Sequence, residues 1–148
     1  MVLYYKLYQS NDFSEISAKD YLSSLVDQIL QNFPNRSSVG IVADIAEFSI
    51  DSSKLQPLGL IINELLTNIM KYAFKGRSEG QIRISALLKG QRVALRIQDD
   101  GVGLPESIDF KNSTGFGLML VESLTDQLRG DIKIERGGGT TILLEFEL

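Results

Sequence analysis

Cysteine and histidine are both absent from the 148 residues of this chain. Without cysteine there can be no disulfide, no cysteine-type zinc site and no thiol nucleophile. Without histidine, Ser-His-Asp catalysis, histidine metal ligands and a phosphorylated histidine on this chain are excluded. These two absences remove several of the commonest ways in which a small protein holds a metal or performs catalysis.

Long apolar runs and basic clusters are missing as well. No apolar stretch approaches the ~20 residues that a membrane-spanning helix needs, and the N-terminus lacks the basic and apolar regions of a signal peptide. No region is strongly basic and the net charge is −4, so we expect neither nucleic-acid binding nor direct membrane contact. We expect a cytoplasmic location, and a longer parent protein could carry a membrane anchor at a distant segment.

The residues that are present suit one soluble domain with a hydrophobic core, since 43% are hydrophobic and 23% are charged. Apolar spacing predicts helices over 17–33, from a cap at 51–53 to about Phe74 with Pro57 in the first turn, and over 117–129. Alternation predicts strands over 39–50, 82–86, 93–97, 131–136 and 140–147. The pattern indicates an α+β fold, a two-layer sandwich with helices on one face of a mixed, mostly antiparallel sheet.

The long predicted helix carries polar side chains that packing does not require. On a helical wheel, one arc is apolar and faces the sheet, whereas Asn63, Glu64, Thr67, Asn68 and Lys71 lie opposite. Glu64, Asn68 and Lys71 stack along one edge. A solvated outer face would explain them, but asparagine is a poor helix former. An amide oxygen, a carboxylate and a cation together suit Mg²⁺ and phosphate, and Asn68 with phosphate and water oxygens would suffice for the metal.

Two glycine segments follow. Asp99-Asp100-Gly101-Val102-Gly103 comes directly after a predicted strand, where glycine lets the backbone approach a ligand and Asp99 could accept a hydrogen bond from a purine amino group. A tight turn with an Asx-type hydrogen bond is the alternative. Gly115-Phe116-Gly117-Leu118 opens a helix whose free amides suit phosphate, unless these glycines serve only loop flexibility. Neither a GxxxxGK[ST] nor a GxGxxG match is present.

In their order and spacing, these segments resemble the GHKL ATPase superfamily. The run from Asn63 to Asn68 resembles its N box, Asp99-x-Gly101-x-Gly103 its first glycine box, Gly115-x-Gly117-Leu118 its second, and Gly139-Thr140 its terminal Gly-Thr element. Asn68-x-x-Lys71-Tyr72-Ala73-Phe74 and Asp100-Gly-Val-Gly-Leu-Pro105 are most similar to sensor histidine kinases related to the HWE group. The resemblance covers residues 40–148, and 4–29 looks like the linker after the dimerisation helices of that group.

The resemblance implies ATP and Mg²⁺ as ligands and gives roles to individual residues. Asn68 would hold Mg²⁺, and Glu64 resembles the general base of the ATP-hydrolysing members, which in a kinase could assist deprotonation of the acceptor. The adenine contacts implied are Asp99, Gly101, Gly103 and Thr140, and Tyr72 would pack near the nucleotide. The phosphate contacts implied are Gly115 and Gly117 with the adjoining Leu118, Lys71, and Asn63 as a further polar member of the N box.

The resemblance also implies partners. The acceptor histidine of such kinases lies on an upstream helix, so this chain would donate the γ-phosphoryl to a histidine-containing dimerisation domain of its parent, with a response regulator as a later partner. Residues 1–16 would be a linker or the end of that region, and 17–148 the catalytic domain. Asp100 departs from the usual asparagine, and the short 104–114 stretch implies a small ATP lid. Two alternatives stay open, an anti-sigma-factor-type serine kinase and a non-catalytic nucleotide-sensing module.

Overall fold

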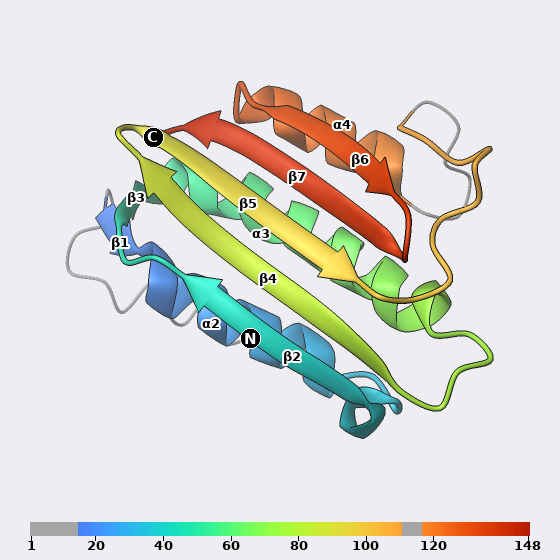
Figure 1. The fold of residues 1–148 in the computed structure, drawn as a ribbon. Coiled ribbons are helices and arrows are strands. Elements are labelled where there is room, and N and C mark those ends of the chain that lie inside the picture. The colour runs from blue at the N-terminus through green and yellow to red at the C-terminus, as the bar shows by residue number, and fades with distance from the viewer. Residues whose placement is uncertain (1–14, 111–116) are drawn as a thin grey trace.

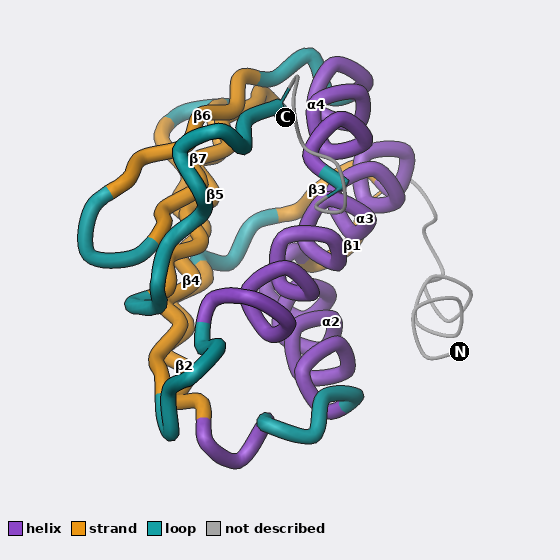
Figure 2. The backbone as a smooth tube through the Cα atoms, turned by 90° about the vertical axis from the view of Figure 1, so that its right-hand side faces the viewer, coloured by secondary structure: helices purple, strands orange, loops and turns teal. Residues whose placement is uncertain are grey.

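The chain forms two layers, seen in a computed structural model that describes residues 15–110 and 117–148 (Figure 1). Helices α2, α3 and α4 cover one face of a five-stranded sheet (Figure 2). In chain order the described elements are β1 Glu15–Ser17, α2 Ala18–Gln31, η1 Arg36–Ser38, β2 Val39–Ile45, β3 Ser49–Asp51, α3 Ser52–Asn68, η2 Ile69–Ala73, β4 Gly80–Lys89, β5 Arg92–Asp99, α4 Leu118–Gln127, β6 Asp131–Arg136 and β7 Thr140–Glu147. This arrangement confirms the predicted α+β two-layer fold.

The main sheet has the strand order β2-β4-β5-β7-β6. β2 and β4 are parallel, and the other neighbouring pairs are antiparallel, so the sheet is mixed and mostly antiparallel as predicted. Gly90, with a φ of +60°, allows the tight turn from β4 to β5. Within the described residues, no helix is both long enough and apolar enough to cross a lipid bilayer.

The predicted strand over 39–50 is wrong as a single element, because β2 ends at Ile45 and β3 begins at Ser49. β3 pairs with β1 in a separate two-stranded sheet, with Ile50 opposite Ile16. The intervening Phe48 is buried, and its carbonyl oxygen accepts a hydrogen bond from the Ala18 N–H at 2.8 Å. The break therefore depends on partners far away in sequence, which alternation alone cannot reveal.

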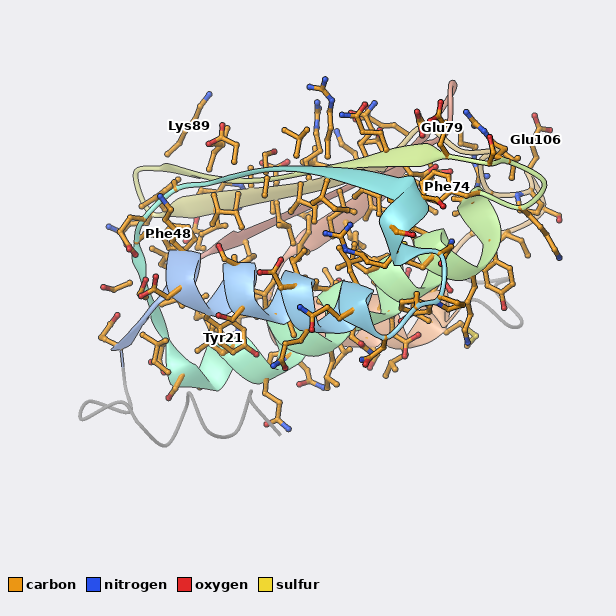
Figure 3. The ribbon with its side chains drawn as sticks, turned by 90° about the horizontal axis from the view of Figure 1, so that it is seen from below. Tyr21, Phe48, Phe74, Glu79, Lys89 and Glu106 are labelled. Atoms are coloured by element: carbon orange, nitrogen blue, oxygen red, sulfur yellow. The ribbon has the colours of Figure 1, made fainter. Side chains whose placement is uncertain are left out.

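Caps and one close approach fix the helical layer. Asp51 accepts a hydrogen bond from the Ser53 N–H at 2.9 Å and caps α3, as predicted. Because α3 begins at Ser52, Pro57 lies inside the helix and not in its first turn, which corrects the prediction. Tyr21 points from α2 toward α3 (Figure 3), where a Cβ on Gly59 would lie only 2.6 Å from its hydroxyl oxygen. Glycine at this position therefore lets the two helices approach.

α3 does not continue to Phe74 as a regular helix, which corrects a second prediction. After Asn68 the chain forms a π-helical turn, η2, a rare element that often occurs at functional sites. The Ala73 carbonyl oxygen accepts a hydrogen bond from the Val102 N–H at 2.8 Å. Phe74 follows and lies between the two layers, at the opposite end of the molecule from Phe48 (Figure 3). The turn is held by the hydrogen bond from Val102, about thirty residues further along the chain, so a helical wheel built from neighbouring residues could not predict the turn.

Candidate functional site

A partly open cavity of about 250 Å³ lies between the helical layer and the end of the sheet where β5 finishes and β7 begins. Its wall is largely apolar, as in most small-molecule sites. The apolar wall is formed by Leu65, Ile69, Ile97, Leu104 and Ile142. The predicted site residues that line it are Asn68, Tyr72, Asp99, Gly103, Leu118 and Thr140. Residues from four separate segments of the chain therefore converge on one cavity.

Asp99 is the buried acid of this cavity, and it is only 4% exposed. Its Oδ1 accepts a hydrogen bond from the Gly101 N–H at 2.8 Å. Burial raises the pKa of the Asp99 carboxyl above its usual value and the neighbouring Asp100 adds to this, whereas the N–H groups of Gly101 and Thr140 and the charge of Arg77 lower the pKa. A carboxylate so desolvated in an apolar cavity is suited to accept a hydrogen bond from an amino group of a ligand.

Glycines bring the backbone of the 99–104 loop against its neighbours. A Cβ on Gly101 would overlap the Ala73 carbonyl oxygen, so only glycine lets the loop lie against η2. Gly101 packs against Ala73 of η2 and is not among the described residues that line the cavity. Gly103 does line it and has a φ of +80°. On the other side, a Cβ on Gly139 would overlap the Asp99 carbonyl oxygen.

The start of β7 and the end of β6 hold the same loop. Thr140 is 7% exposed and stands opposite Asp99 in the β5–β7 register. Its Oγ1 accepts a hydrogen bond from the Leu104 N–H at 3.0 Å. Arg136 donates hydrogen bonds to the carbonyl oxygens of Leu104 and Pro105. Sequence reasoning missed Arg136, because it acts on a loop that is distant along the chain and belongs to no recognisable motif.

Glu64 meets the start of α4. Gly117 is the N-cap of that helix with a φ of +67°, and a Cβ on it would overlap the Glu64 carboxylate oxygen Oε2. Leu65 and Leu118, the residues that follow Glu64 and Gly117 in sequence, line the cavity, whereas Glu64 and Gly117 themselves are not among the described lining residues. Gly115, the other glycine of the predicted phosphate segment, lies outside the described residues, as do residues 111–114 of the predicted lid and residues 4–14 of the predicted linker.

Lys75, which the sequence analysis did not single out, is the lysine that lines the cavity. Lys71 and Asn63 are exposed and are not among the described lining residues. The helical wheel aligned Lys71 with Asn68 by assuming a continuous α-helix. The π-helical turn over Ile69–Ala73 changes that angular spacing, and the phosphate contact of Lys71 stays a prediction. Asp100 also points away from the cavity, since its Oδ1 accepts a hydrogen bond from the Gln81 N–H at 2.8 Å.

Comparison with known proteins identifies relatives of the whole cavity-bearing region. Residues 53–148 match the profile of the family described as histidine kinase-, DNA gyrase B-, and HSP90-like ATPase. The chain is 30% identical over 106 residues to Blue-light-activated histidine kinase 2 of Erythrobacter litoralis (strain HTCC2594), which covers 71% of this chain and 30% of that relative. It is 26% identical over 123 residues to the serine-protein kinase RsbW of Listeria monocytogenes serotype 4a (strain HCC23), which covers 74% of each.

The fold has close counterparts among solved structures. The histidine kinase domain from the Erythrobacter litoralis EL346 blue-light activated histidine kinase aligns with a TM-score of 0.88 and 21% identity, covering 99% of this chain and 70% of that one. This chain spans only 30% of the length of the blue-light-activated relative matched in sequence. The profile match extends over well more than half of the chain and includes every lining residue of the cavity. The chain belongs to the family of histidine kinase-, DNA gyrase B- and HSP90-like ATPases.

Proposed function

We propose that this chain is the ATP- and Mg²⁺-binding catalytic domain of a two-component sensor histidine kinase, and that it donates the γ-phosphoryl of ATP to a histidine outside these 148 residues. The observation that carries the proposal is one cavity in which the buried Asp99 and the half-buried amide side chain of Asn68 both form part of the wall. The likeness to a histidine kinase over 71% of the chain favours histidine as the acceptor. The proposed catalytic domain is 17–148, with 1–16 as a linker or the end of the dimerisation region, and the proposed location is cytoplasmic.

The end of the cavity near Asp99 fits a purine base. Apolar side chains such as Ile97 and Ile142 provide two surfaces for a flat ring, and Tyr72 adds an aromatic ring. Asp99 would accept a hydrogen bond from the exocyclic amino group, which guanine does not present at the same position. Thr140 would reach the base directly or through water, in addition to holding Leu104. Selection of adenine would then depend on a single buried acceptor with fixed geometry.

The other end fits phosphate and a divalent cation. Asn68 offers an amide oxygen, the kind of ligand that Mg²⁺ takes from proteins when phosphates and water fill its remaining positions. Gly117 opens α4, and backbone N–H groups at the start of a helix favour phosphate oxygens. Lys75 supplies positive charge at the cavity wall, with Lys71, Asn63 and Gly115 as further candidates along the triphosphate path.

ATP supplies the transferred phosphoryl group, and the role of the chain is to hold and orient it while neutralising charge. Glu64 is proposed as the base that accepts a proton from the acceptor, because its carboxylate lies against Gly117 at the start of α4 and because it precedes Asn68 by one turn of α3. This assignment requires only that the carboxylate be ionised and near the γ-phosphate. No group on the chain itself can receive the phosphoryl as phosphohistidine, since histidine is absent.

The proposal is tested by the chemistry of the phosphorylated product. The chain is incubated with γ-labelled ATP and Mg²⁺, with and without the histidine-containing dimerisation domain encoded in the same gene. We expect label on the added domain that is lost in acid and retained in alkali, as phosphohistidine requires, and little ATP hydrolysis by the chain alone. Absence of acid-labile label, with ATP binding demonstrated by calorimetry, would contradict the histidine kinase assignment while leaving the nucleotide site intact.

A serine kinase is the second candidate, favoured by the match to RsbW, which spans 74% of both chains. The same assay separates the two, because phosphoserine survives acid and is lost in alkali. Acid-stable label on a serine of a small protein partner would support this candidate. Binding of ATP with no transfer to either class of acceptor would support a nucleotide-sensing module that lacks catalysis.

A further inference from the structure

Arg136 and Thr140 are partners in the last pair of the β6–β7 ladder, and together they hold one residue of the cavity wall, Leu104. Thr140 Oγ1 accepts a hydrogen bond from the Leu104 N–H at 3.0 Å, and the Arg136 guanidinium donates one to the Leu104 carbonyl oxygen at 3.1 Å. Leu104 is therefore fixed from both sides by one hairpin end. Leu104 and the following Pro105 both line the cavity.

The guanidinium extends this hold along the loop. It also donates to the Pro105 carbonyl oxygen at 3.0 Å and to the Ile108 carbonyl oxygen, and the Ile108 N–H in turn donates to the Pro105 carbonyl oxygen at 2.9 Å. Three carbonyl oxygens thus converge on one side chain. Such a planar group with five donors can serve several acceptors in fixed directions, which a lysine ammonium on a flexible stem does less well.

We infer that Arg136 is a positioning residue for nucleotide binding, which keeps the 104–108 segment in the conformation that closes the base end of the cavity. The inference rests on the proposed function for the identity of the ligand. Arg136 itself is exposed and is not among the described residues that line the cavity, so it acts through Leu104 and Pro105 and touches no ligand atom. Without it, ligand binding would have to order the segment, and affinity would fall by the cost of that ordering.

This arrangement predicts which ligands should bind more weakly when the Arg136 side chain is removed. Leu104 is hydrogen-bonded to Thr140 and follows Gly103, and all three line the cavity with Asp99, the proposed base contact, whereas the proposed phosphate contacts Asn68 and Gly117 belong to other segments. A residue that shapes only the base end should matter equally for adenosine, ADP and ATP. A residue that contacted phosphate would matter most for ATP and not at all for adenosine. The pattern across the three ligands therefore separates positioning of the wall from direct recognition of charge.

The test is Arg136→Ala, with calorimetric affinities for adenosine, ADP and Mg·ATP and with hydrogen exchange on the ligand-free chain. We expect all three dissociation constants to rise by a similar factor, about tenfold, which corresponds to about 1.4 kcal/mol. The amides of Leu104 and Ile108 should exchange faster, and those of β5 should not change. Arg136→Lys should restore part of both effects. Arg96→Ala, which removes an exposed arginine between the buried Leu95 and Ile97 of β5, is the matched control and should change neither.

The outcomes are separable. Wild-type chain that binds none of the three ligands would overturn the proposed function, and the exchange data would then still report on whether Arg136 holds the loop. Wild-type binding with unchanged affinities in Arg136→Ala would overturn the inference alone. A loss confined to ATP would also overturn it, since it would assign Arg136 to phosphate. If the alanine variant unfolds, Arg136→Lys and Arg136→Gln provide the same comparison.

Discussion

The proposed base end of the cavity is held by hydrogen bonds to backbone groups, whereas the proposed phosphate end consists mainly of side chains on α3. At the base end, Asp99 is buried and accepts a hydrogen bond from the Gly101 N–H, and Thr140 holds Leu104. At the phosphate end, Asn68 and Glu64 are half-buried and Asn63 is exposed. The first region is therefore defined by contacts within the folded chain, while the second consists of the side chains that we propose to contact a metal ion and phosphate.

This difference predicts that substitutions in the two regions have different effects on folding stability and on catalysis. Substitutions at the base end should change both folding and affinity, because their partners are backbone groups of neighbouring elements. Substitutions at the phosphate end should change metal dependence or rate and leave folding nearly unaltered. The five predictions below test this separation, beginning with the largest expected effect.

Glu64→Gln should slow phosphotransfer by about 10²–10⁴-fold, the usual contribution of a positioned general base. The amide keeps the shape of the side chain over Gly117 but cannot accept a proton. ATP affinity and melting temperature should stay close to those of the wild type, as measured by calorimetry. The control is Glu135→Gln on the exposed edge strand β6. A variant with normal transfer rate would assign Glu64 to a structural role only.

Asp99→Asn should weaken binding of adenosine and of ATP by about 100-fold, because the introduced NH₂ group faces the amino group of the base and leaves donors without acceptors. The asparagine Oδ1 can still accept the hydrogen bond from the Gly101 N–H. Titration calorimetry with both ligands measures the loss. Equal affinity in wild type and variant would show that the base binds in another part of the cavity.

The same variant should alter the pH dependence of stability in a defined direction. Burial raises the pKa of Asp99, so the folded chain holds that proton more tightly than the unfolded chain. The free energy of unfolding of the wild type should therefore fall, relative to Asp99→Asn, as pH rises from the ordinary carboxyl pKa through the raised one. At neutral pH the variant should be at least as stable. Urea denaturation of both proteins across pH 3–8 measures the difference, and a difference of opposite slope would contradict the assigned cause.

Gly101→Ala should lower the free energy of unfolding by about 1–3 kcal/mol, the usual cost of overpacking. The added Cβ meets the Ala73 carbonyl, a backbone group that cannot rotate away, so the 99–103 loop and η2 must separate. Gly40→Ala on β2 is the control, since a Cβ there approaches nothing nearer than 3.9 Å. We expect denaturant melts to separate the two variants clearly, and similar stabilities would show that the loop can move at little cost.

Asn68→Ala should reduce ATP affinity by about tenfold in the presence of Mg²⁺ and very little in its absence, because it removes one oxygen ligand among several. Adenosine binding should not change. Calorimetry with Mg²⁺ or with a chelator provides the comparison, and Asp99→Asn provides the opposite pattern. If affinity for adenosine falls as well, Asn68 belongs to the base end and the division of the cavity is wrong.

Local pattern predicted most of the fold, and the failures have one kind of cause. Alternation and helical spacing gave the hairpins and the helices around residues 18–31 and 118–127. The break at Phe48, the strand β1 and the π-helical turn all depend on contacts between segments far apart in sequence. Those contacts have no periodicity that a window of neighbouring residues could contain.

The residues of the candidate site divide in the same way, into those that a local sequence motif identifies and those that depend on contacts distant in sequence. Asp99, Gly103 and Thr140 could be predicted because each belongs to a motif, and the structure brings them to one cavity with Asn68 and Tyr72. Their roles toward a ligand stay predictions. Lys75 and Arg136 carried no motif, and each was missed because its place depends on the path of a loop. The phosphate contact of Lys71 came from the family resemblance and stays a prediction, although the turn at 69–73 replaces the α-helical spacing that had aligned Lys71 with Asn68.

The π-helical turn at Ile69–Ala73 has a consequence for protein engineering. Each of its hydrogen bonds spans one residue more than an α-helical bond, so the turn accommodates one additional residue within the helix. Its last carbonyl is already committed to Val102. We therefore expect residues 69–73 and 101–103 to behave as one transferable unit. A chimera that takes one of these segments from a relative without the other should fold with a poorly matched contact between the two segments.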